Sequence, residues 1–572
     1  MNDYLPYTKN FYGRIAKFFL VIPLLVTACQ PASALVQDSF PTATAAPATP
    51  MPTSQPSPTI APTPLTISVS GLQLPPGVVT DIYPVGIVTS GPGSDADIIT
   101  EMVEPEEEYE LISYHVYALV APFFTIQDDI SLSKLRGYLT GRRNISEAPF
   151  TGIEVRNTDK AALQALINPK GPRSVALVEE SFSSQKEFTD KQAWSILPFE
   201  LLSPEFKVIS IDGVSPLDDD FDPKSYPLTL AVGIRLTNSN QEVDPALLEE
   251  VLPEGNYQPD QLTSLIMTGV TAMARDTAYE MEIEGVLYPG TEIRDVMRGA
   301  DLTHISNEVS FYEGCKFPDP DYTGFIFCSN PEYIELLDDL GADIIELTGN
   351  HNNDVRALYK VDSVPFTLDL YDQYGMQWYA GGTNLVNAQT PLKIEHNGNK
   401  IAFIGCNYYG PEMAWATGDS SGAAACEDFG WMKREIFNLK QEGYLPIVTL
   451  QYQEDYFLNA TTKAIQDFRP LAEAGAVIVN GSQSHVAKAM EFYADAFVHY
   501  GLGNLFFDQP GVYITYDSFI QKHFFYKGRH INTKLLTITL EDTAKPRFMT
   551  AEEREKFLFN LFTVSEDLRR NR

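Results

Sequence analysis

The second half of this chain repeats one pattern, in which a short apolar run ends in a polar loop and a helical stretch follows. The clearest copy is ADIIELTGNHNNDV at Ala342–Val355. Its apolar run, Ile344–Leu347, indicates a buried strand that ends at Gly349, where glycine allows a sharp turn and a close backbone approach to a ligand. Open α/β sheets place their sites beyond the carboxyl ends of buried strands. The pattern predicts an α/β fold with a site in these loops, or else a plain turn in which Asn and Asp bond their own backbone.

Length and charge limit the function classes. The chain has 572 residues, which is too long for one hydrophobic core, and 44% of them are hydrophobic, so we expect a globular protein of several domains. Its net charge is −35, which argues against nucleic acid or an anionic membrane as an electrostatic partner. We expect no nucleic-acid partner.

The first residues predict export. Three basic residues (Lys9, Arg14 and Lys17) precede the apolar run Phe18–Val26, which is too short for an ordinary transmembrane helix. The next residues lead to Cys29 in the sequence VTAC, which resembles a bacterial lipobox. We therefore expect a lipoprotein signal peptide over residues 1–29 and a membrane anchor through lipid on Cys29, with the protein facing outside the cytoplasm. The alternative is an ordinary secretory signal with an incidental cysteine.

Four further cysteines suggest two disulfides, since an even number in an exported chain favours pairing. Near neighbours pair most simply, which gives Cys315–Cys328 and Cys406–Cys426. Free buried thiols are the alternative.

The chain divides by composition. Residues 30–64 are rich in Pro, Thr, Ala and Ser and predict an extended linker. Residues 65–238 alternate strand and helix patterns and predict a smaller α/β domain. Within it, Tyr117–Gly141 and Ala193–Leu228 resemble pieces of a periplasmic solute-binding domain, in which a strand-end APF and a later IDG would line the cleft. An unrelated α/β domain is the alternative. Residues 546–572 are charged and predict a surface helix or tail.

Residues 261–545 are predicted as a second, larger α/β domain. The strands expected in residues 65–238 are Leu65–Val69, Tyr114–Ala121, Ser174–Val178, Val208–Ile211 and Leu228–Ile234. The strands expected in residues 261–545 are Leu262–Gly269, Asp301–Ser306, Ile344–Leu347, Ile401–Gly405, Pro446–Leu450, Val477–Val479, Ala496–Tyr500 and Lys534–Leu540.

Five strand ends together carry a family resemblance. They are TGVTAMAR from Thr268, SNE at Ser306–Glu308, TGNH at Thr348–His351, NGSQSHV at Asn480–Val486, and VHYGLGNLFFD at Val498–Asp508. In this order and spacing the region resembles the CapA family of bacterial poly-γ-glutamate capsule biosynthesis proteins. The resemblance implies a two-sheet metallophosphoesterase-like sandwich flanked by helices and a role in capsule or cell-envelope polymer synthesis.

The chain departs from that family at three metal-ligand positions. Val270 stands where the family has Asp, and Gln451 and Gln483 stand where it has His. A two-metal site is therefore not expected, because Val offers no donor and a Gln carbonyl is a weak, hard ligand. The resemblance leaves one divalent ion (Mn, Mg or Ca) as an expectation, with these four ligands: Glu308, Asn350, His351 and His485.

Two functions stay open. The first is a metal-dependent hydrolase or transferase acting on a cell-envelope polymer, with His351 and Glu454 as catalytic candidates. The second is a surface-anchored protein that binds a polymer or an anionic small molecule without turnover. An anion or sugar would be held by hydrogen bonds from Gln451, Gln483, Asn350 and His485, and Ser482 is a further ligand-binding candidate.

Purely structural roles are also open for single residues. His351 could bond a strand-end carbonyl, His485 could cap a following helix, and Glu308 could pair with Arg275. We interpret the polar residues of two further stretches as structural: Asn352, Asn353, Asp354, Asn504 and Asp508.

Overall fold

The computed structural model describes residues 65–69, 87–90, 97–103, 108–167, 175–178, 192–237, 244–251, 255–322 and 324–570. The signal peptide, Cys29 and the linker that the sequence predicts lie outside these residues. None of the described helices is both long enough and apolar enough to cross a membrane.

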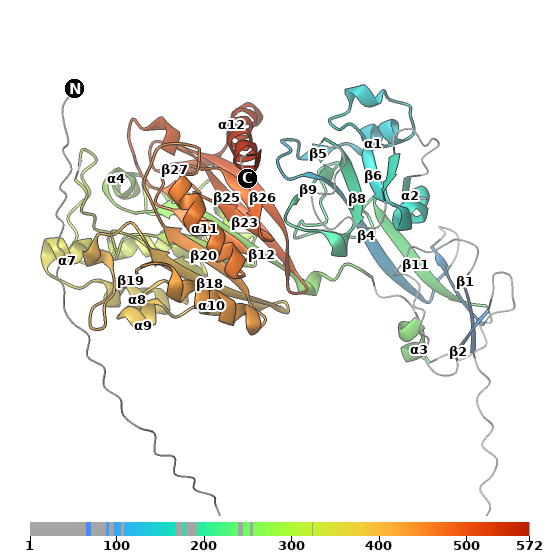
Figure 1. Ribbon diagram of the computed structural model, residues 1–572, viewed down its shortest axis with the longest axis horizontal. Helices are drawn as coiled ribbons and strands as arrows, with labels where there is room; N and C mark the ends of the chain where they lie inside the picture. The colour runs from blue at the N-terminus through green and yellow to red at the C-terminus, as the bar shows by residue number, and fades with distance from the viewer. Residues whose placement is uncertain are drawn as a thin grey trace, which may run out of the picture. The chain divides into compact units, whose positions relative to one another are not determined.

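The first α/β region is built on a nine-stranded mixed sheet (Figure 1). Its strand order is β2-β1-β3-β11-β4-β8-β6-β7, with β9 paired to β4. The bounds are β1 Leu65–Val69, β2 Ile87–Ser90, β3 Ile98–Met102, β4 Leu111–Pro122, β6 Ile153–Arg156, β7 Val175–Val178, β8 Trp194–Pro198, β9 Phe206–Val208 and β11 Thr229–Leu236, with helices α1 Leu132–Leu139, α2 Lys160–Ile167 and α3 Pro245–Val251.

One strand prediction in this region is wrong. Val208–Ile211 is not a single strand, because β9 ends at Val208 and pairs with β4, whereas β10 (Ser210–Ile211) pairs with β5 (Asp129–Ile130). The intervening Ile209 is buried and its N–H donates to the carbonyl of Leu119 at 2.8 Å. The short segment VISI thus contains a change of strand partner.

The region from Leu262 contains two large sheets. The eight-stranded sheet has the order β15-β14-β13-β12-β25-β26-β27, with β24 paired to β12, and the six-stranded sheet has the order β17-β18-β20-β21-β23-β22. The first comprises β12 Leu262–Thr271, β13 Leu302–Asn307, β14 Ile344–Glu346, β15 Gln377–Tyr379, β24 Asn504–Phe506, β25 Asp517–Tyr526, β26 Arg529–Glu541 and β27 Lys545–Phe548. The second comprises β17 Leu392–His396, β18 Asn399–Asn407, β20 Leu445–Gln451, β21 Ile478–Ser482, β22 Met490–Tyr493 and β23 Ala496–His499, and a small pair is formed by β16 Gly381–Gly382 and β19 Gly422–Ala423.

Alternating side chains make these sheets a sandwich. Leu265 and Met267 of β12 pack with Phe403 of β18 in the interior between the sheets. Ile266 points to the opposite face and packs against helices. The outer layers are α4 Arg275–Glu284, α5 Arg294–Arg298, α6 Ile334–Asp339 and α8 Val364–Gln373 on one sheet, and α10 Gly430–Gln441 and α11 Thr462–Ala474 on the other. The two-sheet sandwich flanked by helices that the sequence predicts is confirmed.

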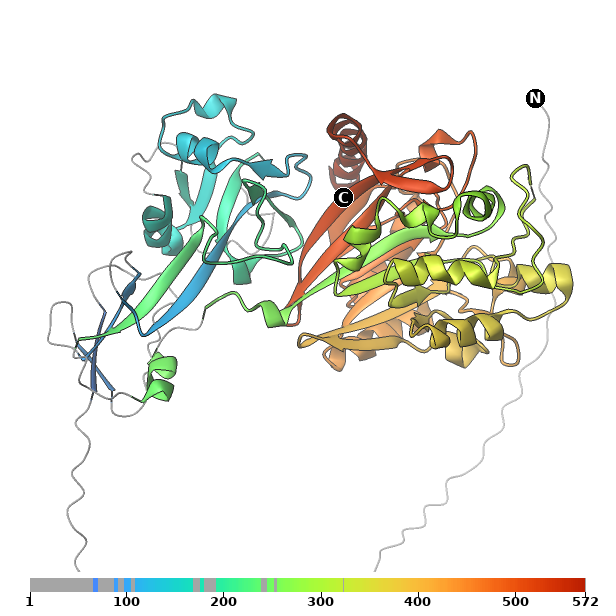
Figure 2. The same cartoon turned by 180° about the vertical axis from the view of Figure 1, so that it is seen from behind.

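The two helical layers can be followed in the figures. The orange helices α10 and α11 lie in front of the strands in Figure 1, and the yellow-green helices of the other layer lie in front in Figure 2. The predicted C-terminal segment forms α12, Ala551–Arg570, whose buried Leu558 and Leu561 pack with Phe519 of β25. Two short helices, α7 Asp354–Tyr359 and α9 Leu385–Ala388, complete the region.

Parallel pairing brings several strand ends together. In the first sheet β12, β13 and β14 are parallel neighbours, and in the second β18, β20 and β21 are parallel neighbours. The carboxyl ends of parallel neighbours lie at one edge of a sheet, so the loops that follow them are adjacent. This edge positions the candidate site.

Buried histidines between the sheets should make stability depend on pH. Burial lowers the pKa of His499 to about 3, while an unfolded histidine titrates near 6.5. Below pH 6.5 the unfolded chain therefore binds a proton that the folded chain does not, so this stability is present above 6.5 and is lost as the pH falls towards 3. As the pH falls from 6 to 4, the free energy of unfolding should decrease by about 1.4 kcal/mol less per pH unit in the variant His499→Gln than in the wild type. Urea unfolding at a series of pH values measures this, and identical slopes would contradict it.

Candidate functional site

The centre of the site is the side-chain amide of Gln451, at the end of β20. Its Nε2 donates to Glu308 Oε2 and to Asn350 Oδ1, each at 2.9 Å, and also to Gln483 Oε1. The hydroxyl of Ser482 donates to Gln451 Oε1 at 2.7 Å. The carboxylate of Glu308 can only accept, so the nitrogen end of the amide faces it, and the hydroxyl of Ser482 meets the oxygen end. Two amide hydrogens are thus shared among three converging oxygen atoms.

The strand ends explain why these residues meet. Glu308 follows β13, Asn350 lies in the loop after β14, and Gln483 follows β21 directly. All of them are buried, and Gln451 is completely so. The structure therefore brings together most of the side chains that the sequence singled out.

Glycine makes this convergence sterically feasible. A Cβ added at Gly349 would lie 2.5 Å from Glu308 Cβ and 2.6 Å from the Glu308 carbonyl oxygen. Two other site residues, Gln483 and His485, have positive φ angles of 70° and 55°. Non-glycine residues in that region are strained, and such strain is concentrated at functional sites.

His351 is held by a carboxylate. Its Nδ1 donates to Asp354 Oδ2 at 2.6 Å, and its Nε2 lies 4.0 Å from Glu308 Oε1. Burial lowers the pKa of His351, but the hydrogen bond to Asp354 and the charges of Glu308 and Asp354 outweigh that effect and raise it. The interpretation in which His351 bonds a strand-end carbonyl is wrong, because Asp354 takes that position.

His485 and Arg275 do not have the structural roles that the sequence suggests for them. The Nδ1 of His485 donates to Asn504 Oδ1 at 2.8 Å, and the next regular element is a strand, β22, so His485 caps no helix. Arg275 pairs with Asp508 at 3.3 Å and not with Glu308. Burial lowers the pKa of His485, and the charge of Glu308 partly offsets this.

The donor set does not fit a two-metal centre. Val270 contributes no donor, and the oxygen atoms of Asn350 and Gln483 already accept from Gln451. Across the described residues, no group of three or more His, Cys, Asp or Glu side chains is placed to hold a metal ion. A single ion held by the four expected ligands stays a prediction. One feature bears on it, since the buried Glu308 Oε1 has no hydrogen-bond partner.

Glu454 lies at the rim of the site. It accepts from the hydroxyl of Tyr409 at 3.2 Å and from the hydroxyl of Tyr456. Both tyrosines are exposed, whereas the Gln451 cluster is buried beneath them. The structure therefore places Glu454 among surface aromatic side chains.

Sequence reasoning misses two residues that orient the histidines. Asp354 and Asn504 are interpreted from the sequence as structural, yet each binds the Nδ1 of a site histidine. The spacing of three residues between His351 and Asp354 is a signal that could have identified Asp354. Asn504 lies 19 residues from His485, and nothing local reveals it.

Both predicted disulfides are present, Cys315–Cys328 and Cys406–Cys426. The second is buried and joins residues 20 apart at the end of β18. We expect its removal by double Cys→Ala substitution to lower the free energy of unfolding by about 3 kcal/mol, because the unfolded chain gains loop entropy. Guanidinium unfolding measures this. The Cys315–Cys328 double variant, in a more exposed loop closing 13 residues, should lose less, and the reverse order would contradict the prediction.

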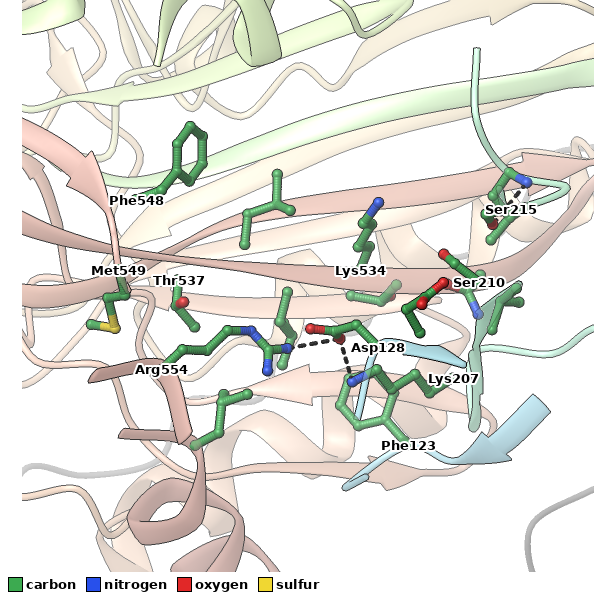
Figure 3. A pocket seen from close by; sticks show the side chains of 18 of the residues that line it. Phe123, Asp128, Lys207, Ser210, Ser215, Lys534, Thr537, Phe548, Met549 and Arg554 are labelled. Carbon is green, nitrogen blue, oxygen red and sulfur yellow. Dashed lines mark hydrogen bonds and ion pairs between the residues drawn. The ribbon is translucent and has the colours of Figure 1, made fainter. Parts of the chain in front are cut away.

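A separate cavity of about 290 Å³ lies away from this site, among Phe123, Lys207, Ser210, Lys534 and Arg554 (Figure 3). It brings together the two segments that resemble a solute-binding domain, since Phe123 comes from the first and Ser210 from the second. Asp128 binds both Lys207, at 2.6 Å, and Arg554, at 2.9 Å, so these cations are already paired. Burial lowers the pKa of Lys207 to about 8. Solute binding by this region stays a prediction.

Residues 264–509 match the family model described as bacterial capsule synthesis protein PGA_cap. The PGA biosynthesis protein CapA of Bacillus subtilis (strain 168) is 22% identical over 274 residues, which cover 47% of this chain and 70% of that protein. The capsule biosynthesis protein CapA of Bacillus anthracis is 20% identical over 281 residues, which cover 48% of this chain and 67% of that protein. A solved structure, the 5'-nucleotidase precursor of Thermus thermophilus, is 12% identical in sequence and has a TM-score of 0.30. The match covers 54% of this chain and 59% of the nucleotidase chain.

Proposed function

We propose that this chain, which belongs to the CapA family of capsule synthesis proteins through residues 264–509, binds a cell-envelope polymer without turning it over. It does so outside the cytoplasm, held to the membrane by lipid on Cys29. The observation that carries the proposal is the position of Gln451 Nε2, whose hydrogens occupy the point where three oxygen atoms converge.

The chemistry of an amide nitrogen supports binding over metal-dependent turnover. A metal ion needs lone pairs directed at it, whereas Nε2 presents hydrogens and has no available lone pair. To admit a cation there, Gln451 would have to turn away and break its bonds to Glu308, Asn350 and Gln483. That exchange leaves the buried amide nitrogen of Gln451 without a partner, and one unsatisfied buried polar group costs about 1–3 kcal/mol.

A second candidate function is a metal-dependent hydrolase or transferase. It is favoured by Glu308 Oε1, which lacks a hydrogen-bond partner and faces His351 Nε2 at 4.0 Å. The bond from His351 Nδ1 to Asp354 resembles the carboxylate–histidine arrangement found behind many metal-binding histidines.

A paired binding and turnover experiment separates the two functions. The purified protein is mixed with poly-γ-glutamate or with glycan chains, with and without Mn²⁺, Mg²⁺, Ca²⁺ and Zn²⁺. We expect at least one polymer to raise the melting temperature, since a ligand that binds the folded state stabilises it. We also expect unchanged polymer length by size-exclusion chromatography. Metal-dependent shortening that disappears in the variant His351→Ala would refute the proposal.

A further inference from the structure

The loops around the Gln451 cluster form a closed ring of contacts, which we call the collar. It consists of Arg275 and residues 325–327, 351–354, 409–415, 454–457 and 507–509. The ring is closed by contacts of Phe327 with His351, Asn353 with Met413, Tyr409 with Glu454, Tyr456 with Gln509, Asp508 with Arg275, and Arg275 with Phe327. The Gln451 amide and Glu308 lie beneath the collar. Burial raises the pKa of Tyr409 most, the charge of Glu454 and its hydrogen bond raise it further, and the charge of Glu308 adds to the rise.

The collar presents several large apolar side chains to solvent. Phe325 is 81% exposed and Phe457 is 70% exposed, and four more are partly exposed, namely Ile326, Tyr409, Met413 and Tyr456. Scattered exposed apolar residues need no explanation, but a group of them around one site marks a surface for binding. Tyr409 and Tyr456 also direct their hydroxyls at one carboxylate, Glu454.

The charges of the collar exclude an anionic chain. Its carboxylates are Asp354, Glu412, Glu454, Asp455 and Asp508, whereas it contains no lysine and only one arginine. That arginine, Arg275, already pairs with Asp508. Lys488, beside the collar, is buried and pairs with Asp455. A polycarboxylate such as poly-γ-glutamate would therefore meet mostly charge of its own sign, since His351 is likewise already paired, with Asp354.

An uncharged sugar chain fits the same surface. Aromatic side chains offer flat apolar faces together with polar edges, which suit the apolar faces and hydroxyl groups of sugar rings. The carboxylate of Glu454 accepts hydrogen bonds, and each tyrosine hydroxyl both donates and accepts. We infer that the collar binds an uncharged glycan chain. This inference rests on the proposed polymer-binding function and names the class of its polymer.

Isothermal titration of the full chain tests the inference. The probes are uncharged hexasaccharides of glucose and of N-acetylglucosamine, with poly-γ-glutamate as the charged alternative, each at low and high NaCl. We expect an uncharged hexasaccharide to bind with an affinity that salt leaves unchanged, because no ion pair forms. The variants Tyr409→Ala and Phe457→Ala should each weaken binding about tenfold, as truncation of an aromatic contact does. Phe437→Ala is the matched control, since Phe437 is 56% exposed on α10 outside the collar and should bind as the wild type does.

Three results would overturn the inference, and they differ from failure of the proposed function. If no uncharged hexasaccharide binds, or if Tyr409→Ala and Phe457→Ala bind like the control, the collar is not a glycan site. Salt-sensitive binding of poly-γ-glutamate alone would likewise overturn the inference while leaving polymer binding intact. Metal-dependent cleavage of a polymer would instead refute the proposed function itself.

Discussion

Replacing Gly349 by alanine should strongly destabilise the protein. The new Cβ would lie 2.5 Å from Glu308 Cβ and 2.6 Å from its carbonyl oxygen, and it would also meet Glu308 Cα. Because these atoms belong to the chain just after β13, relief requires the whole loop to move away from Glu308. We expect the free energy of unfolding to fall by about 3 kcal/mol or more, in the range of severe overpacking.

Gly418→Ala is the control for this prediction. Gly418 has no atom within 4 Å of the position of an added Cβ, so the substitution should leave stability nearly unchanged. Urea unfolding followed by circular dichroism compares the two variants with the wild type. Equal midpoints for Gly349→Ala and Gly418→Ala would contradict the close approach of the loop to Glu308.

Changing Gln451 to glutamate should have the second large effect. The substitution is almost isosteric, but it replaces the shared amide donor by a carboxylate placed against Glu308 Oε2, which is 2.9 Å from the present nitrogen. Asn350 and Gln483 lose their donor at the same time. An uncompensated buried charge costs about 3–5 kcal/mol, so we expect a loss of that order at neutral pH.

Gln453→Glu makes the same chemical change two residues away. Gln453 is only partly buried and its side-chain oxygen accepts from Thr461 at 3.3 Å, which a carboxylate can continue to do. We expect this control to unfold like the wild type. The Gln451→Glu variant should recover stability as the pH falls, because protonation removes the second charge. Thermal melts of both variants at pH 7 and pH 5 measure this, and a Gln451→Glu variant as stable as the control at pH 7 would contradict it.

The parts of the fold that follow hydrophobic patterning could be predicted, and the parts that depend on buried polar groups could not. Ile344–Leu347 and Pro446–Leu450 are identifiable as strands because each is a short apolar run. The ten-residue strand β25 escapes sequence prediction, although it pairs with both β12 and β26. Its Gln521 and His523 are fully buried and bond each other at 3.1 Å, so the apolar period that marks a strand is absent from the sequence.

The site shows the same division. Strand-end position predicts that Glu308 and Asn350 are candidates, because parallel strands align their carboxyl ends, whereas the family resemblance indicates Gln451. The sequence could not reveal which end of the Gln451 amide faces them, since that depends on the carboxylate of Glu308, 143 residues away. Nor could it reveal that the surrounding loops close into a collar, because that ring joins segments from Arg275 to Gln509 through contacts specific to the tertiary structure.

The metal content of the wild-type protein tests the central claim most directly, namely that the Gln451 amide stabilises the site in place of a metal ion. The protein is equilibrated with Mn²⁺, Mg²⁺, Ca²⁺ and Zn²⁺, desalted, analysed by inductively coupled plasma mass spectrometry, and melted with and without EDTA. We predict substoichiometric metal and the same melting temperature in EDTA. One or two equivalents of a divalent metal, together with a melting temperature that falls in EDTA, would contradict the account.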